Sequence, residues 1–220
     1  MPILLLGWGI PQFVTAQFED DFRIWQEFML KEFKQGDWQG YTWGELRFVD
    51  DASELGTWFV QQKFLYQNDP HWQWGLGGSW IEVASASGGW NTLARLEFEA
   101  TPKWKWQGGW KGSLRNRLEG RFWEQRDWDL EWVSRHRLTL SKGLEGLGSL
   151  ERYEFSNELF IDYRVGRLNE NRLRPVNLHF RTGSQSTFNI FVQMRSRRLG
   201  EDRRWVHAAI LGFGLRFSLY

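Results

Sequence analysis

Arginine and glutamate recur at every second position in the middle of the chain, and these side chains carry the clearest chemical potential of the sequence. Arg115, Arg117, Glu119 and Arg121 follow this spacing, with Leu118 between two of them. A guanidinium presents five donors in a planar fork that fits a carboxylate. The candidates for one charge network are Arg115, Arg117, Glu119, Arg121, Glu131, Arg135, Arg137, Glu154, Glu158, Glu170 and Arg172. If paired, such a set neutralises itself; where arginine exceeds glutamate, it attracts anions.

Ser134 and His136 form a second candidate for chemistry. They lie two positions apart and so share one face of a strand, as a hydroxyl nucleophile and an imidazole base would require. Trp132 and Leu138 lie on the same face, which would therefore be the lipid side of a membrane protein. The sequence identifies no carboxylate or asparagine that would orient the imidazole, so a lipid-modifying enzyme is the weakest of the functions considered.

The elements that must position these residues are β-strands, because apolar and polar side chains alternate with a period of two. Near the C-terminus, Trp205, Leu211, Phe213 and Leu215 all fall on one face. Alternation over such lengths indicates strands with two chemically different faces. Eleven segments show it: roughly 19–34, 38–50, 57–67, 72–82, 90–100, 110–124, 130–142, 149–162, 169–182, 186–197 and 203–219.

Segment length and tryptophan placement favour a membrane barrel over a soluble sheet. Many segments exceed the five or six residues typical of soluble strands, and a tilted strand needs about 9 to 11 residues to cross a bilayer. Tryptophan settles at membrane interfaces, and it occurs near segment ends at Trp38, Trp72, Trp90, Trp104, Trp110, Trp123, Trp128 and Trp205. We therefore predict an all-β, membrane-spanning, up-and-down antiparallel β-barrel of about 10–12 strands. A soluble β-sandwich with tryptophan in its core is the rival fold.

The parity of the strand count is left open by the sequence. Bacterial single-chain barrels normally have an even number of strands, so twelve is favoured over the eleven segments marked. The twelfth strand would come either from a missing N-terminal strand or from the region Trp104–Trp110 as a strand of its own.

Composition excludes several classes of function. With 28 basic and 27 acidic residues, the chain lacks the basic excess that nucleic-acid binding requires. The absence of cysteine removes disulfides, thiolate metal sites and cysteine nucleophiles. No apolar stretch is long enough for a transmembrane helix. No metal or cofactor is predicted.

Residues 1–16 resemble a secretory signal, with an apolar stretch that ends in Val14-Thr15-Ala16. A basic residue is missing before Arg23, so the signal is either weak or truncated at its start. The prediction is a signal peptide over 1–16 and a single barrel domain over 17–220.

Several stretches carry a family resemblance. They are 21–25 (DFRIW), 45–48 (ELRF), 114–122 (LRNRLEGRF), 135–138 (RHRL), 157–160 (NELF) and 169–173 (NENRL). On these residues, and over about 20–219, the chain resembles the bacterial domain of unknown function 2490, a family of predicted outer-membrane β-barrel proteins. The resemblance implies a barrel in the bacterial outer membrane, and it implies no known activity and no catalytic residues.

Within a barrel, the charge network has two interpretations. Because basic and acidic residues nearly balance, we favour a lumen filled by paired arginine and glutamate, in a barrel of unassigned role. The alternative is a narrow channel lined by arginine that favours anions. The expected partners are outer-membrane lipid, the outer-membrane assembly machinery and, for a channel, a small anionic solute.

Overall fold

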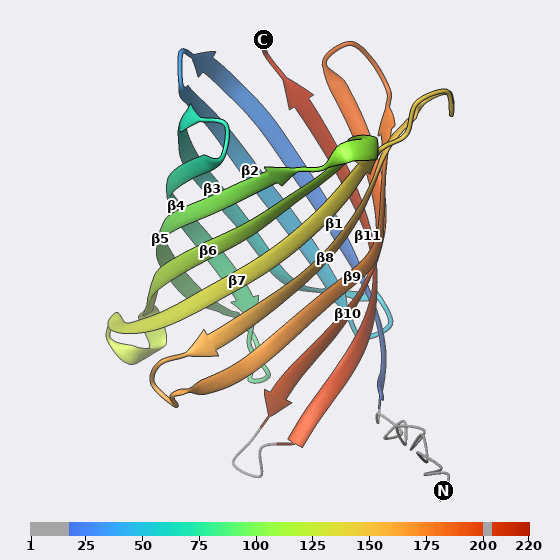
Figure 1. Cartoon of the computed structure of the whole chain (residues 1–220). Helices are drawn as coiled ribbons and strands as arrows, with labels where there is room; N and C mark the ends of the chain where they lie inside the picture. The colour runs from blue at the N-terminus through green and yellow to red at the C-terminus, as the bar shows by residue number, and fades with distance from the viewer. Residues whose placement is uncertain (1–17, 200–203) are drawn as a thin grey trace, which may run out of the picture.

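The computed structural model describes residues 18–199 and 204–220, which form one closed β-barrel (Figure 1). The strands are β1 (Phe18–Gln35), β2 (Trp38–Val49), β3 (Glu54–Asp69), β4 (Trp72–Ala84), β5 (Trp90–Lys105), β6 (Trp110–Trp123), β7 (Asp129–Gly143), β8 (Leu150–Asp162), β9 (Arg167–Arg181), β10 (Ser186–Leu199) and β11 (Arg204–Ser218). Two 3-10 turns, η1 (Gln107–Gly109) and η2 (Glu124–Arg126), precede and follow β6. Within these described ranges, no helix is long and apolar enough to cross a membrane. The expected signal peptide, 1–16, lies outside them.

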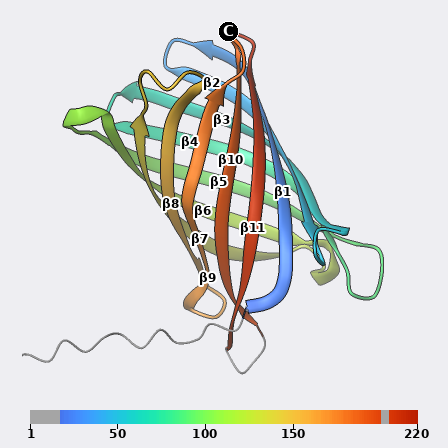
Figure 2. The same ribbon diagram turned by 90° about the vertical axis from the view of Figure 1, so that its right-hand side faces the viewer.

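The barrel closes with an odd number of strands because its first and last strands are parallel. Each strand pairs with its neighbours in the chain, and β1 pairs with β11 in register from Phe22–Ala209 to Lys31–Ser218. Figure 2 shows the two strands side by side. All other pairs are antiparallel, so an odd ring needs one parallel join. Eleven strands are therefore confirmed, and the twelfth strand that parity favoured is absent from the described residues.

The region Trp104–Trp110 does not make a separate strand. Trp104 and Lys105 are the last residues of β5, which runs five residues beyond the predicted end at 100, and Trp110 begins β6. The soluble β-sandwich is also wrong, because a sandwich needs two separate sheets and here one sheet closes on itself.

β5 shows how the alternating sequence builds the wall. Arg95, Glu97 and Glu99 are buried, whereas Leu96 and Phe98 are 61% and 52% exposed. Successive side chains of a strand point to opposite faces, so the charged residues face the lumen and the apolar ones cover the exterior. This arrangement is the inverse of a soluble domain.

Two glycines of β11 make room for lumen side chains. A Cβ atom at Gly212 would overlap the ring of Phe191, and one at Gly214 would overlap the amide of Asn189. Phe191 and Asn189 lie directly across the β10–β11 ladder from these glycines. The glycines thus let β10 fill the lumen beside β11, where Phe191 packs with Trp25 and Ile210.

Exposed tryptophans gather near both ends of the barrel. The C-terminus and the connections 36–37, 70–71, 106–109, 144–149 and 182–185 form the end that we call the upper rim, at the top of Figure 1. The connections 50–53, 85–89, 124–128 and 163–166 belong to the lower rim. Near the upper rim lie Trp38, Trp72, Trp74, Trp104, Trp106 and Trp110, and near the lower rim lie Trp80, Trp90, Trp128 and Trp132.

The parallel join can be tested with a disulfide, because the chain has no cysteine of its own. Phe28 and Leu215 are ladder partners, and both are outward-facing and exposed. We expect the pair Phe28→Cys/Leu215→Cys to oxidise and to change the mobility of the denatured chain on a non-reducing gel, since partners across a ladder fall within disulfide reach. The control Phe28→Cys/Leu211→Cys is four residues out of register and should stay reduced. Equal oxidation of both pairs would contradict the register.

Candidate functional site

Four buried glutamates hold together the charged residues in the middle of the lumen. Glu97, Glu99, Glu119 and Glu158 are each at most 4% exposed, and each lies within 4 Å of three or four cationic side chains. We call the connected set the ion-pair plug. Its members are Lys63, Arg95, Glu97, Glu99, Arg115, Arg117, Glu119, Arg121, Arg135, Arg137 and Glu158.

Glu119 has the most partners in the plug. Its Oε2 accepts from Arg121 Nη2 at 2.6 Å, and its Oε1 accepts from Arg135 Nη1 at 2.7 Å. Arg117 and Arg95 approach the same Oε1 at 3.3 and 3.7 Å. Removing such a carboxylate leaves buried cations without compensation, which is far more costly than losing a surface ion pair.

Lys63 enters the plug from β3. Its side chain is fully buried, and its Nζ lies 2.7 Å from Glu99 and 3.0 Å from Glu97. Arg117 also joins these two glutamates, from Nε to Glu99 at 2.6 Å and from Nη1 to Glu97 at 3.0 Å. The plug therefore crosses from β3 to β8 through shared carboxylates.

Seven of the residues predicted for the network lie in the plug: Arg115, Arg117, Glu119, Arg121, Arg135, Arg137 and Glu158. Glu170 and Arg172 lie outside it and pair with each other at 2.5 Å, and Arg195 joins Glu170 at 2.8 Å. Glu131 is nearer the lower rim with Arg126 and Arg164. Glu154 lies in the upper half, 3.7 Å from His179.

Lys63, Arg95, Glu97 and Glu99 are members of the plug that the sequence analysis missed. The signal was present, because Arg95, Glu97 and Glu99 alternate with Ala94, Leu96 and Phe98 in the same way as the charges of β6. Lys63 gave a weaker signal, as a lone cation between glutamine and phenylalanine.

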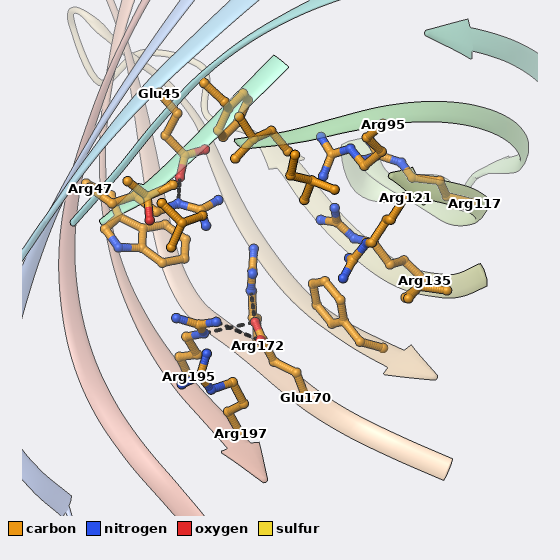
Figure 3. A pocket seen from close by; sticks show the side chains of 18 of the residues that line it. Glu45, Arg47, Arg95, Arg117, Arg121, Arg135, Glu170, Arg172, Arg195 and Arg197 are labelled. Atoms are coloured by element: carbon orange, nitrogen blue, oxygen red, sulfur yellow. Dashed lines mark hydrogen bonds and ion pairs between the residues drawn. The ribbon is translucent and has the colours of Figure 1, made fainter. Parts of the chain in front are cut away.

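A cavity of about 280 Å³ lies between the plug and the lower rim. It is lined by ten arginines and four carboxylates: Arg47, Arg95, Arg117, Arg121, Arg135, Arg137, Arg172, Arg174, Arg195 and Arg197, with Glu27, Glu45, Asp162 and Glu170. Figure 3 labels Glu45, Glu170 and all of these arginines except Arg137 and Arg174. In Figure 3, Arg95, Arg121 and Arg135 gather on one side, opposite Arg47 and Arg195. We call this space the lower cavity.

Arginine and aromatic side chains alternate around the lower cavity. In order, this arginine–aromatic collar consists of Arg95, Phe59, Arg47, Trp25, Arg172, Phe160 and Arg135. Each guanidinium carbon lies 4.3 to 5.9 Å from the centroid of its neighbouring ring, within the range of cation–π attraction. Glu119 joins the two ends, so the collar holds its arginines in place from both sides.

A partition of four residues separates the lower cavity from a smaller one above it. The upper cavity, of about 120 Å³, shares Glu27, Trp43, Arg137 and Arg174 with the lower one. Arg174 Nη2 donates to Glu27 Oε1 at 3.0 Å. This ion pair thus links two of the four residues that line both spaces.

The outer wall carries a hydrogen-bonded Ser–His–Asn set. His136 Nε2 lies 3.2 Å from Ser134 Oγ, and His136 Nδ1 lies 2.8 Å from Asn116 Oδ1. Asn116 is directly opposite His136 in the β6–β7 ladder, and its amide nitrogen donates to the carbonyl of Leu114 at 3.3 Å. Asn116 is the orienting residue that sequence reasoning missed, because only the strand register identifies it.

The role of Glu119 in the plug can be tested by Glu119→Gln. We expect this variant to lower the free energy of unfolding by about 3–5 kcal/mol, because four arginines lose their shared carboxylate. The control Glu151→Gln removes a carboxylate paired with exposed Arg181 near the upper rim, and it should cost less than about 1 kcal/mol. Urea unfolding from lipid vesicles, followed by tryptophan fluorescence, measures both; equal losses would contradict a central role for Glu119.

Comparison with known proteins adds one structural neighbour. No family model matches the chain, and no curated protein matches it. The anion-selective porin from Comamonas acidovorans is similar over 80% of this chain, at 10% sequence identity and a TM-score of 0.38. The chain spans 55% of the length of that porin. Membership of the domain of unknown function 2490 family stays a prediction.

Proposed function

We propose that this protein is an integral β-barrel of the bacterial outer membrane whose lumen is closed by the ion-pair plug. The observation that carries the proposal is the inverted distribution of side chains. Leu76 and Leu96 are both 61% exposed on the exterior, while Lys63 and Glu119 are fully buried inside. Such a surface is costly in water and favourable in hydrocarbon.

The dimensions of the wall support a membrane location. The strands have 12 to 18 residues, enough to cross a bilayer at a tilt and to extend beyond it. The exposed tryptophans near the two rims match the aromatic girdles of outer-membrane barrels. The outer-membrane assembly machinery and outer-membrane lipid are the partners that this location implies.

The mid-lumen supports a closed barrel rather than an open channel. The ion-pair plug, with side chains from β3, β5, β6, β7 and β8, occupies one part of the lumen cross-section. The four residues of the partition between the two cavities occupy another part. Conduction requires a path that an ion can both enter and leave, and the bonded Glu27–Arg174 pair lines both cavities of the lumen. The narrow anion-favouring channel would need this pair to open.

Electrical conductance distinguishes the closed barrel from the narrow anion-favouring channel. We expect the wild-type barrel to give no steps in a planar bilayer, and Glu27→Ala/Arg174→Ala to give steps because the two cavities become one. The double variant removes both charges together, so neither is left buried and unpaired. The exposed pair Glu151→Ala/Arg181→Ala is the matched control and should stay silent.

Folding is verified by the difference in gel mobility between unboiled and boiled samples. Wild-type steps that disappear in Arg137→Glu would favour the channel. A chain that stays soluble without detergent and shows no mobility difference would overturn the membrane assignment.

The Ser–His–Asn set favours a second candidate function, hydrolysis of a lipid ester at the outer wall. In this reaction His136 Nε2 takes the proton of Ser134 while Oγ attacks the ester carbonyl, and Asn116 holds the imidazole through Nδ1. The imidazolium then protonates the departing alcohol. Water afterwards releases the fatty acid and restores the serine.

The outer wall offers a matched control for this reaction. Ser196 Oγ lies 2.8 Å from His207 Nδ1, so it forms a second outward serine–histidine contact. A hydrolase built on Ser134 loses about 10³-fold or more of its turnover in Ser134→Ala and keeps it in Ser196→Ala. The measurement is fatty-acid release from phospholipid in mixed micelles. No release by the wild-type protein, or release that survives Ser134→Ala, would rule the hydrolase out.

A further inference from the structure

We propose that the lower cavity is a binding site for a small organic anion with at least two negative charges and an apolar part. The proposal rests on the proposed function, because the closed plug is what gives the cavity a floor and makes it a binding site. The ligand would enter from the lower rim. Asp162, the last residue of β8, and Arg197, near the end of β10, both line the cavity.

The charge of the cavity wall favours an anion. Its ten arginines face four carboxylates. If the four plug glutamates behind the wall are added, with Lys63 and Arg115, twelve cations still face eight carboxylates. The excess of positive charge lies inside the barrel wall, where electrostatic attraction is stronger than at an exposed surface.

The carboxylates are shared too widely to satisfy every arginine. Glu119 serves four cations and Glu158 serves three. Among the described residues, the buried atoms Arg95 Nε, Arg117 Nη2 and Arg137 Nε have no hydrogen-bond acceptor. The wall is thus short of acceptors, and acceptor oxygens brought by a ligand would be stabilised at those arginines that keep accessible surface.

Several arginines keep accessible surface toward the cavity. The side chains of Arg47, Arg121, Arg137 and Arg195 are 16–22% exposed, whereas Arg117 is only 1% exposed. All of them line the lower cavity. The rings of the collar and one carboxylate partner each restrict the guanidinium groups of Arg47 and Arg172, so binding there costs less side-chain entropy than it would at a flexible surface.

One wall of the cavity is apolar, which distinguishes it from a site for an inorganic ion. Phe59, Ile81 and Leu93 form a buried cluster, and Val83 and Trp123 pack against it. All five line the cavity. An anion with an aromatic or branched hydrocarbon part would contact this wall while its charged groups meet the arginines.

The volume limits the size of the ligand. Pockets for drug-sized molecules occupy roughly 300–1,000 Å³, and this cavity has about 280 Å³. A single aromatic ring system with one phosphate or two carboxylates is therefore the appropriate size. A lipid with long acyl chains is too large.

Binding can be tested with 1-naphthyl phosphate as the probe, on the full-length barrel in lipid nanodiscs, by isothermal titration calorimetry. We expect saturable binding of the probe and much weaker binding of inorganic phosphate and of 1-naphthol, which each lack one half of the ligand. Arg47→Gln and Arg172→Gln should each raise the dissociation constant about tenfold or more, as expected for a lost charge-assisted hydrogen bond. Arg216→Gln, a lumen arginine that lines the upper cavity instead, is the control and should leave binding unchanged.

Unboiled gel mobility verifies that each variant is folded. If Arg47→Gln does not fold, Arg197→Gln, at the exposed end of the cavity, provides the same test and should also weaken binding. The proposal is overturned if the folded wild-type barrel does not bind the probe, if Arg216→Gln weakens binding as much as Arg47→Gln, or if inorganic phosphate binds equally well. A silent bilayer recording together with no binding would reject the site and retain the closed barrel. Conductance together with binding would overturn the closed lumen and, with it, the floor that the proposal gives to the cavity.

Discussion

The neutralisation of buried charge is the constraint on which the rest of this barrel depends. Lys63 and Glu119 have no accessible surface, and a charge so placed is tolerated only when its partners and hydrogen bonds repay its lost hydration. Closure of the sheet brings β3 and β8 close enough for their side chains to share carboxylates. The closed sheet therefore positions the charged side chains, and the paired side chains in turn fill the lumen that the sheet encloses.

The sharing of carboxylates also explains how one lumen contains two different environments. Toward the middle of the lumen, each glutamate of the plug has several cationic partners, and its side chain is buried. Toward the lower rim, arginine outnumbers carboxylate, and Arg47 and Arg172 lie beside the rings of Trp25 and Phe160 in addition to one carboxylate each. A ring face attracts a cation without neutralising it. The collar therefore holds its arginines in position without cancelling the excess of arginine over carboxylate around the lower cavity.

Much of the fold could be predicted from the period of two, because alternation reports directly on a wall with unlike faces. The alternation predicted the eleven strands, and it predicted which residues of β6 and β7 face the lumen, including Arg117 and Arg135. It could not give the parallel join of β1 and β11, since pairing between the ends of a chain leaves no local pattern. The role of Asn116 could not be predicted for the same reason, because its partner His136 is 20 residues away and only the strand register brings the two together. Lys63 was missed because a single cation does not indicate which carboxylates it will meet.

The join between β1 and β11 has a consequence for the order in which the barrel forms. The other ten pairs link neighbours along the chain and can grow as successive hairpins, whereas this pair must bring together residues as distant as Phe28 and Leu215. Its closure bears the loop entropy of almost the whole chain, and non-local contacts of this kind slow folding. Parallel ladders are also slightly less stable per residue. The wall therefore has a seam, which would be the last part to form and the first to separate.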